Sequence, residues 1–163
     1  MPLVVDTNVA VVSNGRSRQA SPVCVLTCIE WLEQIKNGIH TLVLDDQFRI
    51  IREYLQNLRS SGQPGYGDAF LKWVFDNYRN VNRCELVTIT SISEDLGHFA
   101  EFPNDPELGD FDPSDRKFIA VALAHPQHPA VLQAVDARWW QLRDALRRNG
   151  VRIEFICAQD ISL

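Results

Sequence analysis

Five short apolar runs, separated by longer segments with helical periodicity, place the strongest constraint on the fold of this chain. Each run has the length and the content of Val, Leu and Ile expected of a buried strand. Strands of this kind that alternate with helices are typical of a parallel sheet covered on both faces. The sequence therefore predicts an α/β fold, a three-layer α/β/α sandwich with a twisted, mainly parallel sheet. The runs are residues 3–5, 41–44, 84–89, 131–135 and 151–156.

The segments between these runs carry signals for helix ends. Ser21 and Pro22 predict the N-cap and the first residue of a helix that closes at 36–38, where Asn and Gly follow Lys. After the second run, Asp45 or Asp46 is expected to cap the next helix. Further helices are expected at 70–78, 114–124 and 139–146, and surface loops at 13–21, 61–67 and 97–113.

The length and net charge of the chain limit the number of domains and the kinds of function that it can have. The 163 residues fit one domain, 1–163, with a single core. The net charge of −5 argues against a protein that holds nucleic acid by bulk electrostatics, but not against an enzyme that concentrates acids in one site. No apolar run approaches the ~20 residues of a membrane helix, and an acid at position 6 comes too early for a signal peptide. We therefore expect a cytoplasmic protein without membrane association.

The four cysteines match no zinc-binding pattern. Cys24 and Cys28 are four residues apart, and the sequence has no second pair of Cys or His that could complete a zinc site with them. Cys84 and Cys157, like the first two, lie in apolar surroundings. We expect four buried, reduced core thiols.

Four acids lie near the carboxyl ends of predicted strands. In open parallel sheets, ligand-binding and active sites are usually found at these ends. Asp6 follows the first predicted strand and Asp136 follows the fourth. Asp115 lies in the first turn of the helix after the third strand, and Glu53 lies about two turns into the helix after the second. Because these ends meet at one edge of the sheet, the four carboxylates are expected to converge there.

Crowded carboxylates repel one another, and a divalent cation relieves that repulsion. Ligands that are all oxygen select hard ions, here Mg²⁺ or Mn²⁺, and such ions activate water and stabilise phosphoryl displacement. The acids therefore predict phosphodiester hydrolysis. Each also has a simpler interpretation: Asp6 and Asp136 as helix caps, Asp115 as a first-turn charge, and Glu53 as an exposed helix residue.

The acids lie in segments that resemble those of PIN-domain nucleases. Residues 4–9 (VVDTNV) resemble the opening strand of that family, which ends in Asp-Thr-Asn. Residues 51–55 (IREYL) resemble a toxin-like subgroup with Glu-Tyr on this helix. Residues 112–120 resemble the third acidic segment, an Asp ahead of an alanine-rich helix, and 135–138 fall where the fourth acid is expected. Order and approximate spacing agree over about positions 3–145.

The resemblance implies a twisted parallel sheet flanked by helices, a divalent metal and endonuclease activity, more often on RNA, single-stranded or structured, than on DNA. It implies that Asn8 holds the Asp6 side of the site through hydrogen bonds. Asp112 would be an extra ligand or an acid that supports the ligands. The metal-binding and catalytic residues that it implies are Asp6, Glu53, Asp115 and Asp136.

The chain departs from the family pattern just before the fourth acid. Many relatives carry Thr or Ser with Gly there, whereas this sequence has Ala134 and Val135. One alternative is therefore a PIN-fold module that binds nucleic acid without turnover. Another is the toxin of a toxin–antitoxin pair, whose partner is an antitoxin protein. Exposed edge strands make a homodimer a further expectation.

Several residues have more than one interpretation. Five arginines are candidates for guiding the phosphate backbone, and the sequence does not choose among them. Trp139 and Trp140 are either core residues or include a ring that stacks on a base. A receiver domain is disfavoured because no lysine ends a predicted strand, and the motifs of P-loop enzymes and serine hydrolases are missing. The five arginines are Arg16, Arg18, Arg49, Arg52 and Arg138.

Overall fold

Five parallel strands form a single sheet in the computed structural model, which describes residues 1–59, 63–93 and 97–162. The order across the sheet is β3-β2-β1-β4-β5, and every neighbouring pair is parallel. The predicted fold class, a three-layer α/β/α sandwich with a parallel sheet, is confirmed. The strands are β1 (Pro2–Val5), β2 (Thr41–Asp45), β3 (Cys84–Val87), β4 (Ala130–Gln133) and β5 (Ile153–Phe155).

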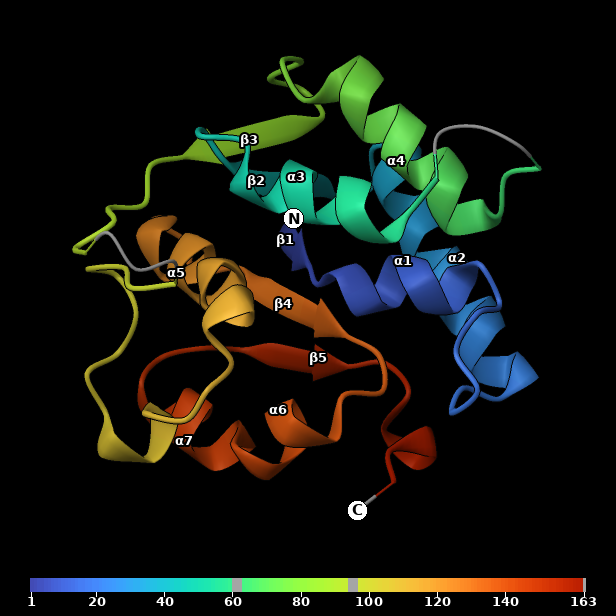
Figure 1. Ribbon diagram of the computed structural model, residues 1–163. Helices are drawn as coiled ribbons and strands as arrows, with labels where there is room; N and C mark the ends of the chain where they lie inside the picture. Colours follow the sequence, from blue (N-terminus) through green and yellow to red (C-terminus); the bar gives the residue numbers. More distant parts are fainter. Residues whose placement is uncertain (60–62, 94–96, 163) are drawn as a thin grey trace.

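Helices connect each strand to the next. The helices are α1 (Thr7–Ser13), α2 (Pro22–Lys36), α3 (Arg49–Asn57), α4 (Tyr66–Asn77), α5 (Arg116–Ala124), α6 (Ala137–Gln141) and α7 (Arg143–Arg148). Short 3-10 turns at 106–108, 113–115 and 158–160 complete the described elements. α1, α2 and α4 pack against one another, whereas α5 packs against β1, β2 and β4 and α7 against β5 (Figure 1). Because crossovers between parallel strands are almost always right-handed, this strand order puts the helices between β1 and β3 on one face of the sheet and those between β3 and β5 on the other.

The middle of the sheet is a topological switch point. β1 lies between β2 and β4, and the chain leaves β1 towards one edge of the sheet but leaves β4 towards the other. The connections therefore diverge at the carboxyl ends of β1 and β4, which opens a crevice there. Asp6 directly follows β1, and its backbone N–H continues the pairing by donating to the carbonyl of Leu132 (3.1 Å).

Local sequence signals explain most helix boundaries. The Ser21 hydroxyl accepts from the Cys24 N–H (3.2 Å), with Pro22 as the first residue of α2. The N-cap of α3 is Phe48 and not Asp45 or Asp46 as expected, but the Asp45 carboxylate does accept from the N–H groups of Arg49 and Ile50, the first residues of the helix.

Other boundaries differ from the expectation. The sequence interpretation left 7–12 without an element, but these residues begin α1, with Asp6 as the N-cap. The loop expected at 61–67 falls partly outside the described residues, and its last two positions begin α4. The loop expected at 97–113 holds two short features, a bridge from Ser91 to Phe99 and the turn 106–108.

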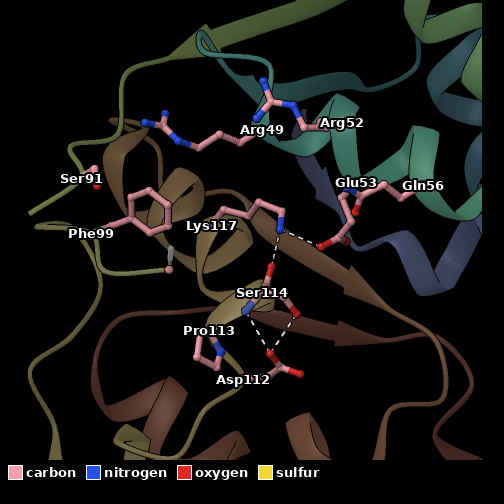
Figure 2. A pocket seen from close by; sticks show the side chains of 11 residues that line it. Arg49, Arg52, Glu53, Gln56, Ser91, Phe99, Asp112, Pro113, Ser114 and Lys117 are labelled. Atoms are coloured by element: carbon pink, nitrogen blue, oxygen red, sulfur yellow. Dashed lines mark hydrogen bonds and ion pairs between the residues drawn. The ribbon is translucent and has the colours of Figure 1, made fainter. Parts of the chain in front are cut away.

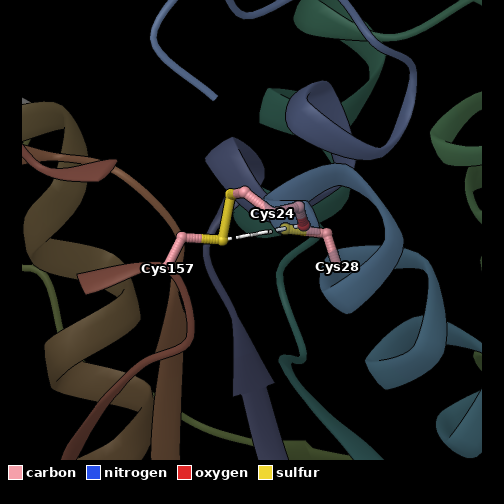
Figure 3. Close-up of side chains that lie close together, drawn as sticks. All are labelled: Cys24, Cys28 and Cys157. Atoms are coloured by element: carbon pink, nitrogen blue, oxygen red, sulfur yellow. Dashed lines mark hydrogen bonds between the residues drawn. A yellow bond between two sulfur atoms is a disulfide. The ribbon is translucent and has the colours of Figure 1, made fainter. Parts of the chain in front are cut away.

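The expectation of four reduced thiols is wrong for two of them. Cys24 and Cys157 form a disulfide, and Cys28 lies beside it (Figure 3). Cys28 and Cys84 are free and buried. The bond joins the start of α2 to the segment after β5, two regions 133 residues apart in sequence. The spacing of the cysteines in the sequence does not indicate that these two regions meet in the fold.

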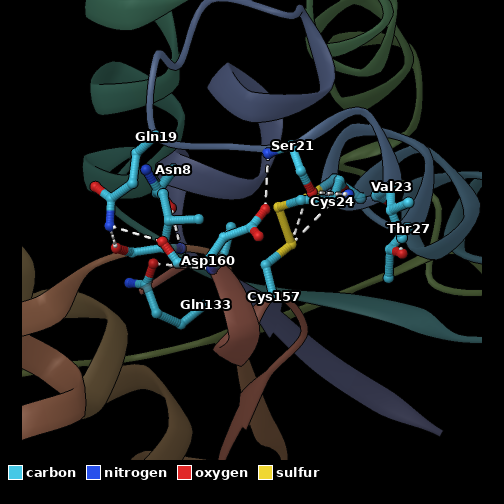
Figure 4. The surroundings of a disulfide bond; sticks show 12 residues. Asn8, Gln19, Ser21, Val23, Cys24, Thr27, Gln133, Cys157 and Asp160 are labelled. Atoms are coloured by element: carbon cyan, nitrogen blue, oxygen red, sulfur yellow. Dashed lines mark hydrogen bonds between the residues drawn. A yellow bond between two sulfur atoms is a disulfide. The ribbon is translucent and has the colours of Figure 1, made fainter. Parts of the chain in front are cut away.

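Hydrogen bonds near the disulfide also hold the segment after β5 in place (Figure 4). Asp160 accepts through its carboxylate from the Ser21 N–H (2.7 Å) and through its carbonyl from Gln19 Nε2 (3.1 Å). Gln19 also donates to the carbonyl of Val135 (3.1 Å), next to Asp136. The C-terminal segment is therefore attached both to α2 and to the loop after β4.

Within the three described ranges, none of the helices combines the length and the apolar character that crossing a membrane requires.

The disulfide predicts two measurable properties. Alkylation of the denatured, unreduced protein should label only Cys28 and Cys84 of the four cysteines, as counted by mass spectrometry. Adding reductant should lower the free energy of unfolding by about 2–5 kcal/mol, because the bond restricts the unfolded chain over a long loop. A Cys157→Ser variant serves as the control, since reductant should not change its stability. Four labelled cysteines in the unreduced protein would contradict the pairing.

Candidate metal centre

Three carboxylates from distant parts of the chain converge at the switch point. Asp6, Glu53 and Asp115 each offer an oxygen, and these atoms all lie within 4.8 Å of one another. Asp6 follows β1, Glu53 lies on α3, and Asp115 ends the turn 113–115. The three line a cleft of about 330 Å³ whose wall also includes Asp136. Three of the four predicted acids thus form one cluster, and the fourth borders the same cleft.

Asp6 is held in place by two donors. Its side chain is buried, and Oδ2 accepts from the Asn8 N–H (3.1 Å) and from Gln133 Nε2 (3.0 Å). Gln133 is fully buried at the end of β4, where its Oε1 accepts from the Ala134 N–H (2.9 Å). The sequence interpretation missed Gln133, although a lone amide in the apolar run VLQAV is a signal for it.

Glu53 is placed by its neighbour on α3. The hydroxyl of Tyr54, which is fully buried, donates to the carbonyl of Val5 (2.6 Å), so α3 is fastened to the end of β1. Glu53 then accepts from the Thr7 hydroxyl and from Lys117 Nζ, 2.6 Å from its Oε1 (Figure 2). The lysine, which the sequence interpretation missed, also donates to the carbonyl of Ser114.

Asp115 is oriented by an indole. Nε1 of Trp139, a buried residue of α6, donates to Asp115 Oδ2 (3.2 Å). Trp139 is therefore a core residue with a polar contact to the site. Trp140 packs edge-on against Phe155, with the Arg143 guanidinium over its ring.

The remaining predicted residues lie around the cluster. Asp136 caps α6 by accepting from the Arg138 N–H (2.8 Å), so its interpretation as a cap and its place beside the cleft both hold. Asp112 accepts from the N–H and the hydroxyl of Ser114 and lies outside the group of three, in a neighbouring cavity. The Asn8 side chain accepts from the Val135 N–H (2.9 Å), which ties the loop after β1 to the loop after β4.

The five candidate arginines separate into groups. Arg49 and Arg52 line the cavity beside the cleft. Arg16 pairs with the buried carboxylate of Asp68 at 3.5 Å. Arg18 and Arg138 are exposed and line neither cavity.

Burial and mutual repulsion disfavour the charged forms of the clustered acids. Desolvation raises the pKa of Asp6 well above its usual value, and the charges of Asp115 and Glu53 raise it further. Desolvation likewise raises the pKa of Asp115 to about 6, against the lowering effect of the Trp139 hydrogen bond. Two of the three acids therefore carry an electrostatic cost at neutral pH that a bound cation would relieve.

No family model, curated protein or solved structure matched this chain.

The raised pKa of Asp115 predicts a stability gain on neutralisation. Its protonated form is favoured in the folded state, so the associated stability is present below its unfolded pKa, near 3.8, and is lost as pH rises through about 6. In EDTA at pH 8, Asp115→Asn should raise the free energy of unfolding by about 1–2 kcal/mol, because it removes a crowded charge. The gain should shrink by pH 5, as measured by urea denaturation. If Asp115→Asn instead lowered the free energy of unfolding equally at pH 8 and pH 5, the wild-type carboxylate would not be destabilised by its neighbours.

Proposed function

We propose that this protein is a divalent-metal-dependent nuclease whose Asp6, Glu53 and Asp115 bind Mg²⁺ or Mn²⁺. The observation that carries the proposal is the convergence of these three carboxylates, with oxygens within 4.8 Å of one another, in a cleft at the switch point of the sheet. Acids brought this close without a cation are costly, and burial, with the charges of neighbouring acids added to it, raises the pKa values of Asp6 and Asp115.

The donor set fits a hard cation. All three groups are carboxylates, and among the described residues the cluster contains neither Cys nor His. A bound Mg²⁺ or Mn²⁺ supplies a Lewis acid that lowers the pKa of water and neutralises charge on a phosphate. Asp136 borders the cleft and is proposed to support the cation or the attacking water from its rim.

Residues around the ligands keep the site organised. Gln133 and the Asn8 backbone fix one oxygen of Asp6, and Trp139 fixes one oxygen of Asp115. The Thr7 hydroxyl donates to Glu53. Since such supporting contacts set ligand orientation, their loss should weaken metal binding without removing a ligand.

The substrate is proposed to be RNA in preference to DNA, following the resemblance of the acidic segments to PIN-domain nucleases. A cytoplasmic location is proposed from the early acid and the lack of a long apolar run in the sequence. An antitoxin is proposed as partner from the resemblance, and a second copy of the chain from the exposed edge strands. The positive side chains of Arg49 and Arg52 next to the cleft suit a phosphate backbone. A module that binds nucleic acid without cutting it is the second candidate, because Ala134 and Val135 leave no hydroxyl just before Asp136.

Metal-dependent cleavage tests the proposal. Labelled single-stranded RNA and DNA, incubated in Mg²⁺ or Mn²⁺, should be cut, while EDTA should prevent cleavage. Asp6→Asn and Asp115→Asn should each lower the rate at least about 100-fold, since a ligand should matter at least as much as the contacts that support it. Asp76→Asn, an exposed acid on α4 paired with Lys72, is the matched control and should cut normally.

The outcomes of this assay separate the candidates. Normal cleavage by the folded Asp6→Asn protein would show that the cluster is not the catalytic site. Binding of RNA with no product in either metal would favour the module that binds without turnover.

Lys117 should compete with the metal, because its ammonium neutralises Glu53 at 2.6 Å. Lys117→Met should tighten Mn²⁺ binding roughly 3- to 10-fold, as expected for losing a rival charge worth about 1 kcal/mol in a wet site. Isothermal titration calorimetry measures this directly, with Lys72→Met as the control for removing an exposed lysine. Weaker binding in Lys117→Met would instead show that the lysine helps to form the site.

A further inference from the structure

A second, larger cavity adjoins the acidic cleft. Its volume is about 550 Å³, within the range of about 300–1,000 Å³ usual for small-molecule sites. Glu53 and Ser114 line both cavities, so the two spaces share a wall. The rest of its lining includes Arg49, Arg52, Gln56, Phe99, Asp112 and Lys117 (Figure 2).

Two arginines of this cavity keep donor groups for a ligand, although Arg49 also forms an ion pair with Asp45. Arg49 and Arg52 are one turn apart on α3, and Arg52 is exposed. The Nη1 of Arg49 is buried and has no hydrogen-bond partner among the described residues. Its nearest acid, Asp45 at 3.6 Å, is already occupied by three backbone N–H groups. An unsatisfied guanidinium donor of this kind favours an incoming anion.

The acids of the cavity are already engaged. Glu53 is paired with Lys117, and Asp112 accepts two hydrogen bonds from Ser114. The lining holds three cations (Arg49, Arg52 and Lys117) and two acids (Glu53 and Asp112), so its formal charge is +1. Phosphate oxygens match the forked donors of Arg better than a single point charge does.

The cavity also has a flat surface. The guanidinium of Arg49 lies over the ring of Phe99, with its carbon 5.4 Å from the ring centre. Phe99 is only 7% exposed, so a ligand in the cavity would meet the Arg49 guanidinium rather than the ring. Unpaired bases stack on guanidinium planes and on aromatic rings in single-stranded recognition.

We infer that this cavity binds one nucleotide of a single strand, adjacent to the bond cut at the metal centre. Its phosphate is held by Arg49 and Arg52, and its base lies against Arg49 where that side chain covers Phe99. A base inside a cavity cannot remain paired, so the site selects single-stranded over duplex nucleic acid. The position of the nucleotide relative to a cut rests on the proposed function, whereas the binding itself does not.

Binding without turnover tests the inference. Fluorescence anisotropy in EDTA would measure the affinity of a labelled six-nucleotide RNA and of the duplex of the same sequence. Arg49→Ala/Arg52→Ala should weaken single-strand binding roughly tenfold or more, the size expected for a lost stacking or phosphate contact. Arg79→Ala/Lys72→Ala removes the same charge from exposed residues outside the cavity, and should change binding less than about threefold.

Two further variants keep the test independent of folding. Arg52→Ala alone truncates an exposed side chain and should still weaken binding. Arg49→Lys retains the charge but loses the flat fork, and should weaken single-strand binding without affecting the melting temperature. If the cavity variants bind like the control variant, or if the duplex binds as tightly as the single strand, the inference is wrong.

This design separates the two proposals. Cleavage that persists unchanged in Arg49→Ala/Arg52→Ala would overturn the nucleotide site and leave the nuclease standing. Single-strand binding that depends on both arginines, in a protein that cuts nothing, would leave the nucleotide site standing and overturn the nuclease.

Discussion

The parallel pairing of β1 with β2 on one side and β4 on the other determines where the polar groups of the site lie. It sets the end of β1 beside the end of β4, so that Gln133 reaches Asp6 across the boundary between them. The same pairing lets Asn8 bond the backbone of Val135. A shift of this register by one residue would turn Asp6 away from its partners, because side chains alternate between the faces of a strand.

The cluster carries an electrostatic cost. Its carboxylates are buried or half-buried, and desolvation, with repulsion between the acids added to it, raises the pKa of Asp6 and Asp115. Lys117 offsets part of that cost by neutralising Glu53. Such an arrangement is expected where a protein holds groups ready for a ligand. Acids that already had favourable partners would gain less free energy when the ligand binds.

Sequence patterns predicted the parallel sheet and the convergence of Asp6, Glu53 and Asp115, because apolar runs and caps are local signals that parallel topology combines in one way. They missed Gln133 and Lys117, whose roles depend on side chains that meet only after folding. They were wrong about Cys24 and Cys157, since α2 and the segment after β5 become neighbours only through the strand order. Family membership remains a prediction.

The disulfide also bears on how copies of this chain can associate. β5 is an edge strand, and the segment after it is bonded covalently to α2 of the same chain. An oxidised chain therefore cannot release this strand to a second copy, which closes the route to a domain-swapped dimer through its C-terminal end. Any dimer of the oxidised protein that uses this end must form between surfaces that are already folded.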